Sequence, residues 1–198
     1  MMADPARRLA TYADLEAVPA HPVAEIIDGT LETHPWPRPR HATMVSELNA
    51  ELGPPFRRGR GGPGGWIFMT EPELHLGPDV VVPDVAGWRR ERMPTEPDAA
   101  FVETSPDWAC EMLSPSTVRL DRGPKRRIYA GAGVGHLWLI EPADGVLEGF
   151  ALDGGRWLLT GSIQRGETVA LPPFDAMPFP FDDLFPFDDP ASPAQSET

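Results

Sequence analysis

Cysteine and long apolar runs are both scarce in this chain of 198 residues, and each scarcity restricts the class of protein. The single cysteine, Cys110, cannot form an internal disulfide, which predicts a reducing, cytoplasmic location. No uninterrupted apolar run approaches the ~20 residues that a membrane helix needs. No apolar segment follows the basic residues near the N-terminus, so we expect neither a signal peptide nor a membrane partner.

Three common kinds of catalytic motif are also missing. The five histidines show no H-x-x-x-H pair, and with one cysteine this disfavours a zinc site. No G-K-[ST] or G-x-S-x-G sequence occurs, which argues against a phosphate-binding loop of that kind and against a serine hydrolase. Residues 59–64 match G-x-G-x-x-G formally, but Pro63 and the strand-like run that follows exclude a dinucleotide site.

The net charge of −13 is unfavourable for a protein that binds nucleic acid, but the charge is unevenly distributed. Residues 172–198 hold six acidic residues and no lysine or arginine. Positive charge gathers in two other runs, residues 38–60 with net +3 and residues 119–127 with net +4. Each run is compatible with a solvated face. The second run contains Arg126 and Arg127, which we take as candidates for substrate binding.

The apolar pattern predicts one domain over residues 1–190 and a disordered tail over residues 191–198. A capping box at Thr11 and Asp14 opens a short helix, and Asp28-Gly29 predicts a hairpin. The remaining helices are expected at 41–52, which Gly53-Pro54 would end, and at 124–132, with Pro124 in its first position. The strands are expected at 23–27, 30–33, 66–70, 73–76, 80–85, 108–113, 136–140, 146–152 and 157–160, with a long loop over 89–107.

Lysine is the scarcest charged residue, since Lys125 stands alone against sixteen arginines. A compact ammonium is not interchangeable with a planar guanidinium, so a lone lysine can mark a specialised site. Upstream, Asp84 follows a proline in a β-forming run and Glu111 lies within another. Two strand carboxylates and one ammonium are the components of a metal-dependent site that cleaves phosphodiesters.

Taken singly, each of these residues also has a structural explanation. Glu111 alternates onto the face of its strand opposite Trp108 and Cys110, and a buried glutamate needs a cation, a metal or a proton. An ion pair with an arginine would satisfy it equally well. Asp84 could cap a turn, and a bias toward arginine could leave one lysine by chance. The ordered set of three favours the hard-cation site.

The order of motifs resembles a known family over about residues 11–184. The matching segments are Glu25-Ile-Ile-Asp-Gly29, His41 in a helix, Pro83-Asp84-Val85, Cys110-Glu-Met-Leu-Ser-Pro-Ser-Thr117, Asp121 with Lys125 and Tyr129, and Gly133-Val-Gly-His-Leu-Trp-Leu-Ile-Glu-Pro142. The chain is similar in these segments to the Uma-two family of restriction-endonuclease-like proteins, within the PD-(D/E)XK nuclease superfamily.

That resemblance implies an α/β fold, a restriction-endonuclease-like αβββαβ core whose mixed central sheet is flanked by helices. It implies that Asp84 and Glu111 bind Mg²⁺, or Mn²⁺, together with the carbonyl of Met112. The superfamily lysine usually lies two residues after the second acid, where this chain has Leu113, so Lys125 in the next helix would replace it. Glu25 would join the site, and His41 is a further candidate for substrate binding.

The first functional hypothesis is therefore a Mg²⁺-dependent endonuclease that hydrolyses DNA phosphodiester bonds with a metal-activated water. The alternative is a non-catalytic interaction protein on a nuclease scaffold, because a fold can host other functions. A third hypothesis is that the acidic tail covers the basic surface and regulates it. A homodimer is a candidate assembly, since cutting two strands favours two sites.

Overall fold

The fold is a mixed α/β arrangement around a six-stranded sheet, seen in a computed structural model that describes residues 8–19, 23–35 and 38–188. The strand order is β10-β9-β8-β7-β6-β3, and only the β7–β8 pair is parallel. The strands are β3 (Trp66–Thr70), β6 (Val85–Arg89), β7 (Trp108–Met112), β8 (His136–Glu141), β9 (Val146–Asp153) and β10 (Arg156–Gln164).

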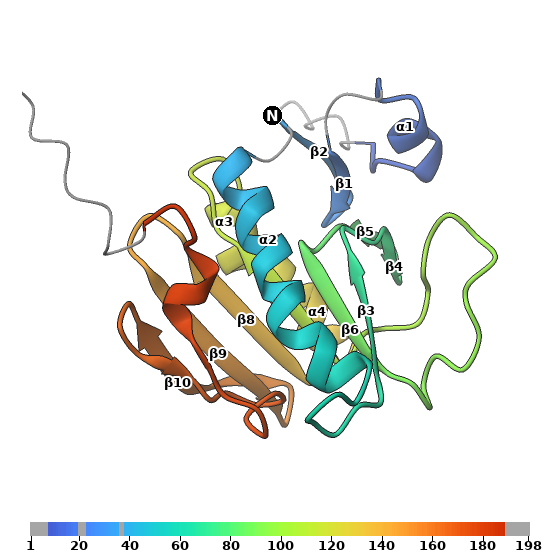
Figure 1. Cartoon of the computed structure of the whole chain (residues 1–198). Helices are drawn as coiled ribbons and strands as arrows, with labels where there is room; N and C mark the ends of the chain where they lie inside the picture. The colour runs from blue at the N-terminus through green and yellow to red at the C-terminus, as the bar shows by residue number, and fades with distance from the viewer. Residues whose placement is uncertain (1–7, 20–22, 36–37, 189–198) are drawn as a thin grey trace, which may run out of the picture.

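Helices cover both faces of this sheet, because its central strands are apolar on both sides (Figure 1). Helix α2 (Pro39–Leu52) buries Met44, Val45, Leu48 and Leu52 on the face that carries Trp108 and Cys110. The opposite face carries Ala109 and Leu113 and packs against Ile128 and Tyr129. The predicted alternation along β7 is therefore confirmed, and it leaves Glu111 on the second face.

Helix α2 ends at Leu52, as the sequence predicted, but the chain does not leave helical geometry at Gly53-Pro54. The chain continues into a π-helical turn, η1 (Gly53–Arg57), which buries Pro55 and Phe56. Phe56 contacts the aromatic cluster around Phe174, with ring centroids 4.8 Å apart. This burial offsets the poor helix propensity of glycine and proline.

A smaller sheet of four strands lies beside the first, in the order β2-β1-β5-β4. It contains β1 (Val23–Ile27), β2 (Thr30–His34), β4 (Leu74–Leu76) and β5 (Asp79–Val81). The predicted hairpin is present, with Asp28 and Gly29 at positive φ. Helix α1 (Tyr12–Glu16) packs Leu15 against Ile26 and Val80, and the Thr11 N–H donates to Asp14 as the capping box predicted.

The run at residues 80–85 was predicted as one strand, and this was wrong. Val81 ends β5 in the small sheet and Val85 begins β6 in the large one. The break falls at Pro83, which has no N–H for a ladder. Asp84 therefore lies between the two sheets and belongs to neither strand.

The helix after β7 begins earlier than predicted, at Val118 and not at Pro124. It comprises α3 (Val118–Leu120), the π-helical turn η2 (Asp121–Lys125) and α4 (Arg126–Gly131). Pro124 lies inside η2 rather than at a first helical position. The widened turn accommodates the proline ring, which an α-helical turn would not.

The start of the acidic C-terminal segment is part of the core. After the short pair β11 (Thr168–Val169) and β12 (Phe179–Pro180) comes the 3-10 helix η3 (Phe181–Leu184). Phe174, Phe179, Phe181 and Leu184 are at most 5% exposed and join the cluster beneath α2. The predicted disordered tail at 191–198 lies outside the described residues, and the single domain over 1–190 stays a prediction. No helix in the described ranges is both long and apolar enough to cross a bilayer.

Candidate active site

A pocket of about 450 Å³ opens where β1, the β5–β6 break, the end of β7 and the η2 turn meet. Asp84, Glu111 and Lys125, which the sequence singled out, all line it, together with Glu25 and His41. Its remaining polar or charged walls are His34, Arg38, Arg40, Glu71, Ser114, Ser116, Thr117, Asp121 and Glu141. Residues from distant parts of the chain thus converge at one edge of the large sheet.

Lys125 lies at the bottom of this pocket and is 2% exposed. Its Nζ is 2.9 Å from Glu111 Oε1, 3.0 Å from Glu25 Oε1 and 3.4 Å from Asp121 Oδ1. It also donates to the Val82 carbonyl at 3.2 Å. Burial alone would lower the pKa of this ammonium, but the surrounding carboxylates raise it well above its ordinary value. Lys125 is therefore a fixed positive charge.

Glu111 accepts a hydrogen bond from a residue of the helical segment that also carries Lys125. The Tyr129 hydroxyl donates to Glu111 Oε1 at 2.5 Å, one helical turn beyond the lysine. Burial raises the pKa of Glu111 well above its usual range, and although Lys125 opposes this, repulsion from Asp121 and Asp84 adds to it. Burial likewise raises the pKa of Asp121. Additional positive charge at this position would lower the raised pKa of both carboxyl groups.

Asp84 is fixed at both oxygens. His41 Nε2 lies 2.7 Å from Oδ1, and the Met112 N–H donates to Oδ2 at 2.6 Å. The N–H and C=O of one residue in a strand point to the same side, so the Met112 carbonyl faces the edge where Asp84 lies. Asp84, Glu111 and this carbonyl thus border one space.

The donor set fits a hydrated divalent cation. Carboxylate and carbonyl oxygens are the ligands that Mg²⁺ takes, with water completing its coordination shell. Each Asp84 oxygen has a second lone pair beside the hydrogen bond it accepts. Within the described residues, no group of three or more His, Cys, Asp or Glu side chains is arranged to hold a metal. Two carboxylates with a main-chain carbonyl are consistent with that finding and with an ion that keeps several waters.

Three further polar groups belong to the site although the sequence did not assign them a role. Asp121 and Tyr129 lie four residues on either side of Lys125, and this i, i+4, i+8 spacing was a readable signal for one helix face. His34 offered no such signal. Its Nε2 is buried without a hydrogen bond, 3.6 Å from Glu25 Oε2.

The two arginines predicted to bind substrate lie outside the pocket. The Arg126 guanidinium stacks over Phe150 at 4.4 Å, and its carbonyl accepts from Trp157 Nε1. Arg127 pairs with Asp28 at 2.8 Å on the surface. Arg38, the N-cap residue of α2, and Arg40, in its first turn, line the pocket instead.

Comparisons with known proteins address the family and the fold of the chain. No curated protein matches the chain. A solved structure described as "a putative nuclease belonging to DUF820" from Anabaena variabilis aligns with a TM-score of 0.68 and 22% identity over 89% of this chain and 97% of that one, which shows a shared fold. The family model described as "Uma2: Putative restriction endonuclease" matches residues 9–177. Because this match covers most of the chain, the protein belongs to the Uma2 family.

Proposed function

We propose that this protein is a Mg²⁺-dependent endonuclease that hydrolyses phosphodiester bonds in DNA. The observation that carries the proposal is the convergence of Asp84, Glu111 and Lys125 on one pocket although they are far apart in the sequence. Membership of a family described as "Putative restriction endonuclease" supports it. The pocket's acidity supports the metal, because a phosphate diester entering among these carboxylates needs a cation to offset repulsion.

In the proposed site, Asp84, Glu111 and the Met112 carbonyl would hold the cation. When bound, Mg²⁺ would lower the pKa of a coordinated water and neutralise charge on the phosphoryl oxygens. His41 and the Met112 N–H fix the orientation of Asp84. Lys125 supplies a buried positive charge next to Glu111, and a preorganised charge of this kind stabilises the negative charge that develops on the scissile phosphate. Glu25 and Asp121 hold the ammonium in position.

The test is nicking of supercoiled plasmid by purified protein with Mg²⁺ or Mn²⁺. Wild type should nick, Asp84→Asn should lose at least about a hundredfold in rate, and EDTA should abolish the activity. Asp153→Asn is the matched control, because Asp153 is an exposed carboxylate at the tip of the β9–β10 hairpin. Equal nicking by wild type and Asp84→Asn would identify a contaminating nuclease and reject the proposal.

A second candidate is a non-catalytic interaction protein on the same scaffold. It is favoured by the contacts of Lys125, because an ammonium that already has four oxygen neighbours has no free N–H for a phosphate. Metal titration separates the two functions, since a bound ion raises the melting temperature by linkage. An endonuclease site should show Mg²⁺-dependent stabilisation that Asp84→Asn removes, whereas a non-catalytic scaffold should show none.

The cellular setting and assembly are part of the same proposal. The buried, unpaired thiol of Cys110 is compatible with a reducing cytoplasm. A homodimer would present two pockets to two strands, and size-exclusion chromatography with light scattering would detect it. A monomer at working concentration would restrict the enzyme to nicking one strand at a time.

A further inference from the structure

A second hollow lies next to the active-site pocket along helix α2. It has a volume of about 650 Å³ and lies between α2, η1 and β3. The two hollows are neighbours, because His41 and Glu71 line the first while the residues next to them in the chain, Ala42 and Thr70, line the second. In the second hollow, Asn49 of α2 connects the helix to β3 by donating a hydrogen bond to Thr70 Oγ1 at 3.2 Å. We call this second hollow the groove, since its lining residues follow α2 from Ala42, beside the pocket, to Arg57 and Arg58 beyond the end of the helix.

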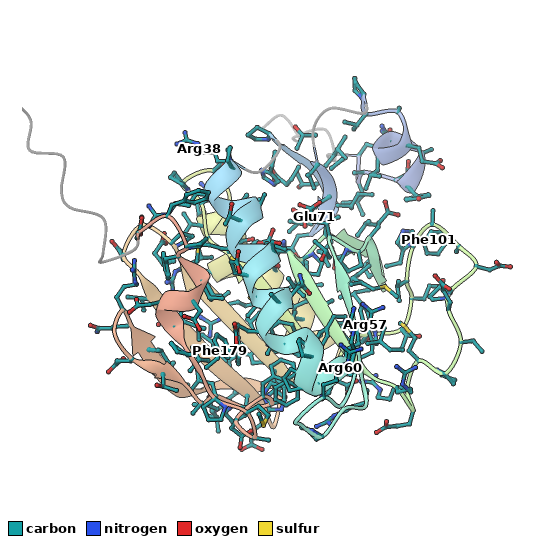
Figure 2. All side chains as sticks on the ribbon, viewed as in Figure 1. Arg38, Arg57, Arg60, Glu71, Phe101 and Phe179 are labelled. Carbon is teal, nitrogen blue, oxygen red and sulfur yellow. The ribbon has the colours of Figure 1, made fainter. Side chains whose placement is uncertain are left out.

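Positive charge without a counterion lies at the far end of this groove. Arg57 and Arg58 line the hollow, exposed Arg60 follows them, and no acidic residue contributes to the wall. Throughout the described ranges, none of these three arginines has an ion pair, whereas Arg92, Arg122 and Arg165 elsewhere do. Figure 2 shows Arg57 and Arg60 near the C-terminal end of α2, opposite the end that carries Arg38.

The acidic residues of α2 point away from the groove. Neither Glu47 nor Glu51 lines the hollow, and α2 contacts η3, which carries Asp182 and Asp183. Helix α2 thus separates an acidic face from the basic groove. In a protein of net charge −13, such a separation leaves the arginines free to attract an anion.

The arginines are carried on an ordered support. The Arg58 N–H donates to the Gly53 carbonyl at 3.1 Å, and the Arg60 N–H donates to Pro54 at 2.8 Å. The glycine-rich turn folds back on this support, where a Cβ at Gly62 would lie 2.6 Å from the Pro55 side chain. The backbone is therefore preorganised, and only the guanidinium groups need to adjust to a ligand.

We propose that this groove, with Arg57, Arg58 and Arg60, binds the phosphate backbone of the DNA strand that leaves the active-site pocket. The inference rests on the proposed endonuclease function and adds the path of its substrate. At about 1.5 Å per residue, the helical rise from His41 to Arg57 is about 24 Å. At about 3.4 Å per base pair, this places the arginine contacts about seven base pairs from the cleaved bond.

The test is equilibrium binding of a fluorescein-labelled 20-base-pair duplex, followed by anisotropy in EDTA over a series of salt concentrations. Arg57→Gln/Arg58→Gln should weaken binding at least about tenfold and make the slope of log K against log salt shallower by about 1.8, the value for two lost phosphate contacts. Arg92→Gln/Arg156→Gln removes the same charge from two sites outside the groove. Circular dichroism and melting temperature establish that both double variants are folded.

Equal weakening by the two double variants would overturn the inference, because net charge alone would then explain it. Binding by wild type that depends on Arg57 and Arg58, without metal-dependent nicking, would reject the proposed activity and retain the groove. Nicking that depends on Asp84, together with binding unchanged in Arg57→Gln/Arg58→Gln, would support the proposed activity and reject the groove as a binding site for DNA.

Discussion

At the scale of single residues, the scarcity of lysine has a physical explanation in the pocket. Lys125 Nζ lies within 3.4 Å of oxygens of Glu25, Glu111 and Asp121, and a compact ammonium has three N–H donors for these three carboxylates. A planar guanidinium is larger and has a fixed fork, so it would displace the surrounding groups. The single position at which the sequence uses lysine is thus one at which arginine would not fit.

Lys125→Met should be strongly destabilising. The substitution leaves Glu25, Glu111 and Asp121 buried together without their shared cation, and breaking a buried charge network costs about 3–5 kcal/mol of unfolding free energy. Urea denaturation measures the loss. Lys125→Arg should also destabilise the protein, because it retains the charge but its larger, planar guanidinium does not fit among the carboxylates. Unchanged stability in Lys125→Met would mean that the carboxylates are not ionised together in the folded protein.

Tyr129→Phe should destabilise the protein by about 1.5–3 kcal/mol, because Glu111 loses a buried hydrogen bond to a charged group. The chain offers a control in its only other tyrosine. Tyr12 also donates to a carboxylate, Glu73, at 2.9 Å, but it is only half-buried. Tyr12→Phe should therefore cost less in the same urea experiment. A larger loss for Tyr12→Phe would contradict the assigned importance of burial at Glu111.

At the scale of secondary structure elements, the sequence was sufficient to predict those features that depend on local patterns alone. The hairpin around Asp28-Gly29 and the alternation along β7 follow from turn chemistry and period-two burial, and both were predicted. The sheet to which each half of the 80–85 run belongs was not predicted, because partner choice depends on tertiary packing.

The helix at 118–131 illustrates a different limit. Pro124 is favoured at a first helical position, so local reasoning started the helix there. The chain instead begins the helix at Val118 and places the proline within η2. This earlier start puts Asp121, Lys125 and Tyr129 on one continuous helical segment, and the three side chains reach Glu111 or its immediate neighbours. Two of them were therefore given no role from the sequence.

The segment after Pro172 shows how composition can mislead, because its acidic residues conceal an apolar anchor. Phe174 is 1% exposed and has ring centroids 4.8 Å from Trp66 and 4.9 Å from Trp108. A truncation at 172 would remove this anchor. A test of the terminal tail should therefore leave residues up to 188 in place.

Phe174→Ala should lower the free energy of unfolding by about 3–5 kcal/mol, through lost transfer energy and the cavity that remains. Thermal or urea denaturation measures the loss. Exposed Phe187, which is 83% accessible, is the control, and Phe187→Ala should change stability by less than about 0.5 kcal/mol. Comparable losses for both phenylalanines would contradict the different packing of the two side chains.

At the scale of the whole molecule, the uneven charge distribution links the C-terminal segment to the pocket. Arg40 lines the pocket and lies 3.0 Å from Asp188 Oδ2, with its guanidinium 5.7 Å from the Phe185 ring. Arg165 approaches the same Asp188 oxygen at 3.0 Å and holds it from the other side. The acidic segment thus neutralises an arginine that would otherwise face an incoming phosphate.

Asp188→Asn should therefore raise DNA affinity, by up to about fivefold, since an exposed ion pair contributes about 0–1 kcal/mol. The anisotropy experiment with the 20-base-pair duplex measures the change. Asp183→Asn changes the net charge equally, but Asp183 is exposed and, within the described residues, forms no ion pair with Arg40 or Arg165. Release of Arg40 predicts a gain for Asp188→Asn that exceeds the gain for Asp183→Asn and disappears when Arg40→Gln is added. Equal gains in the two single variants would instead assign the effect to overall charge and contradict a specific effect of Asp188 on Arg40.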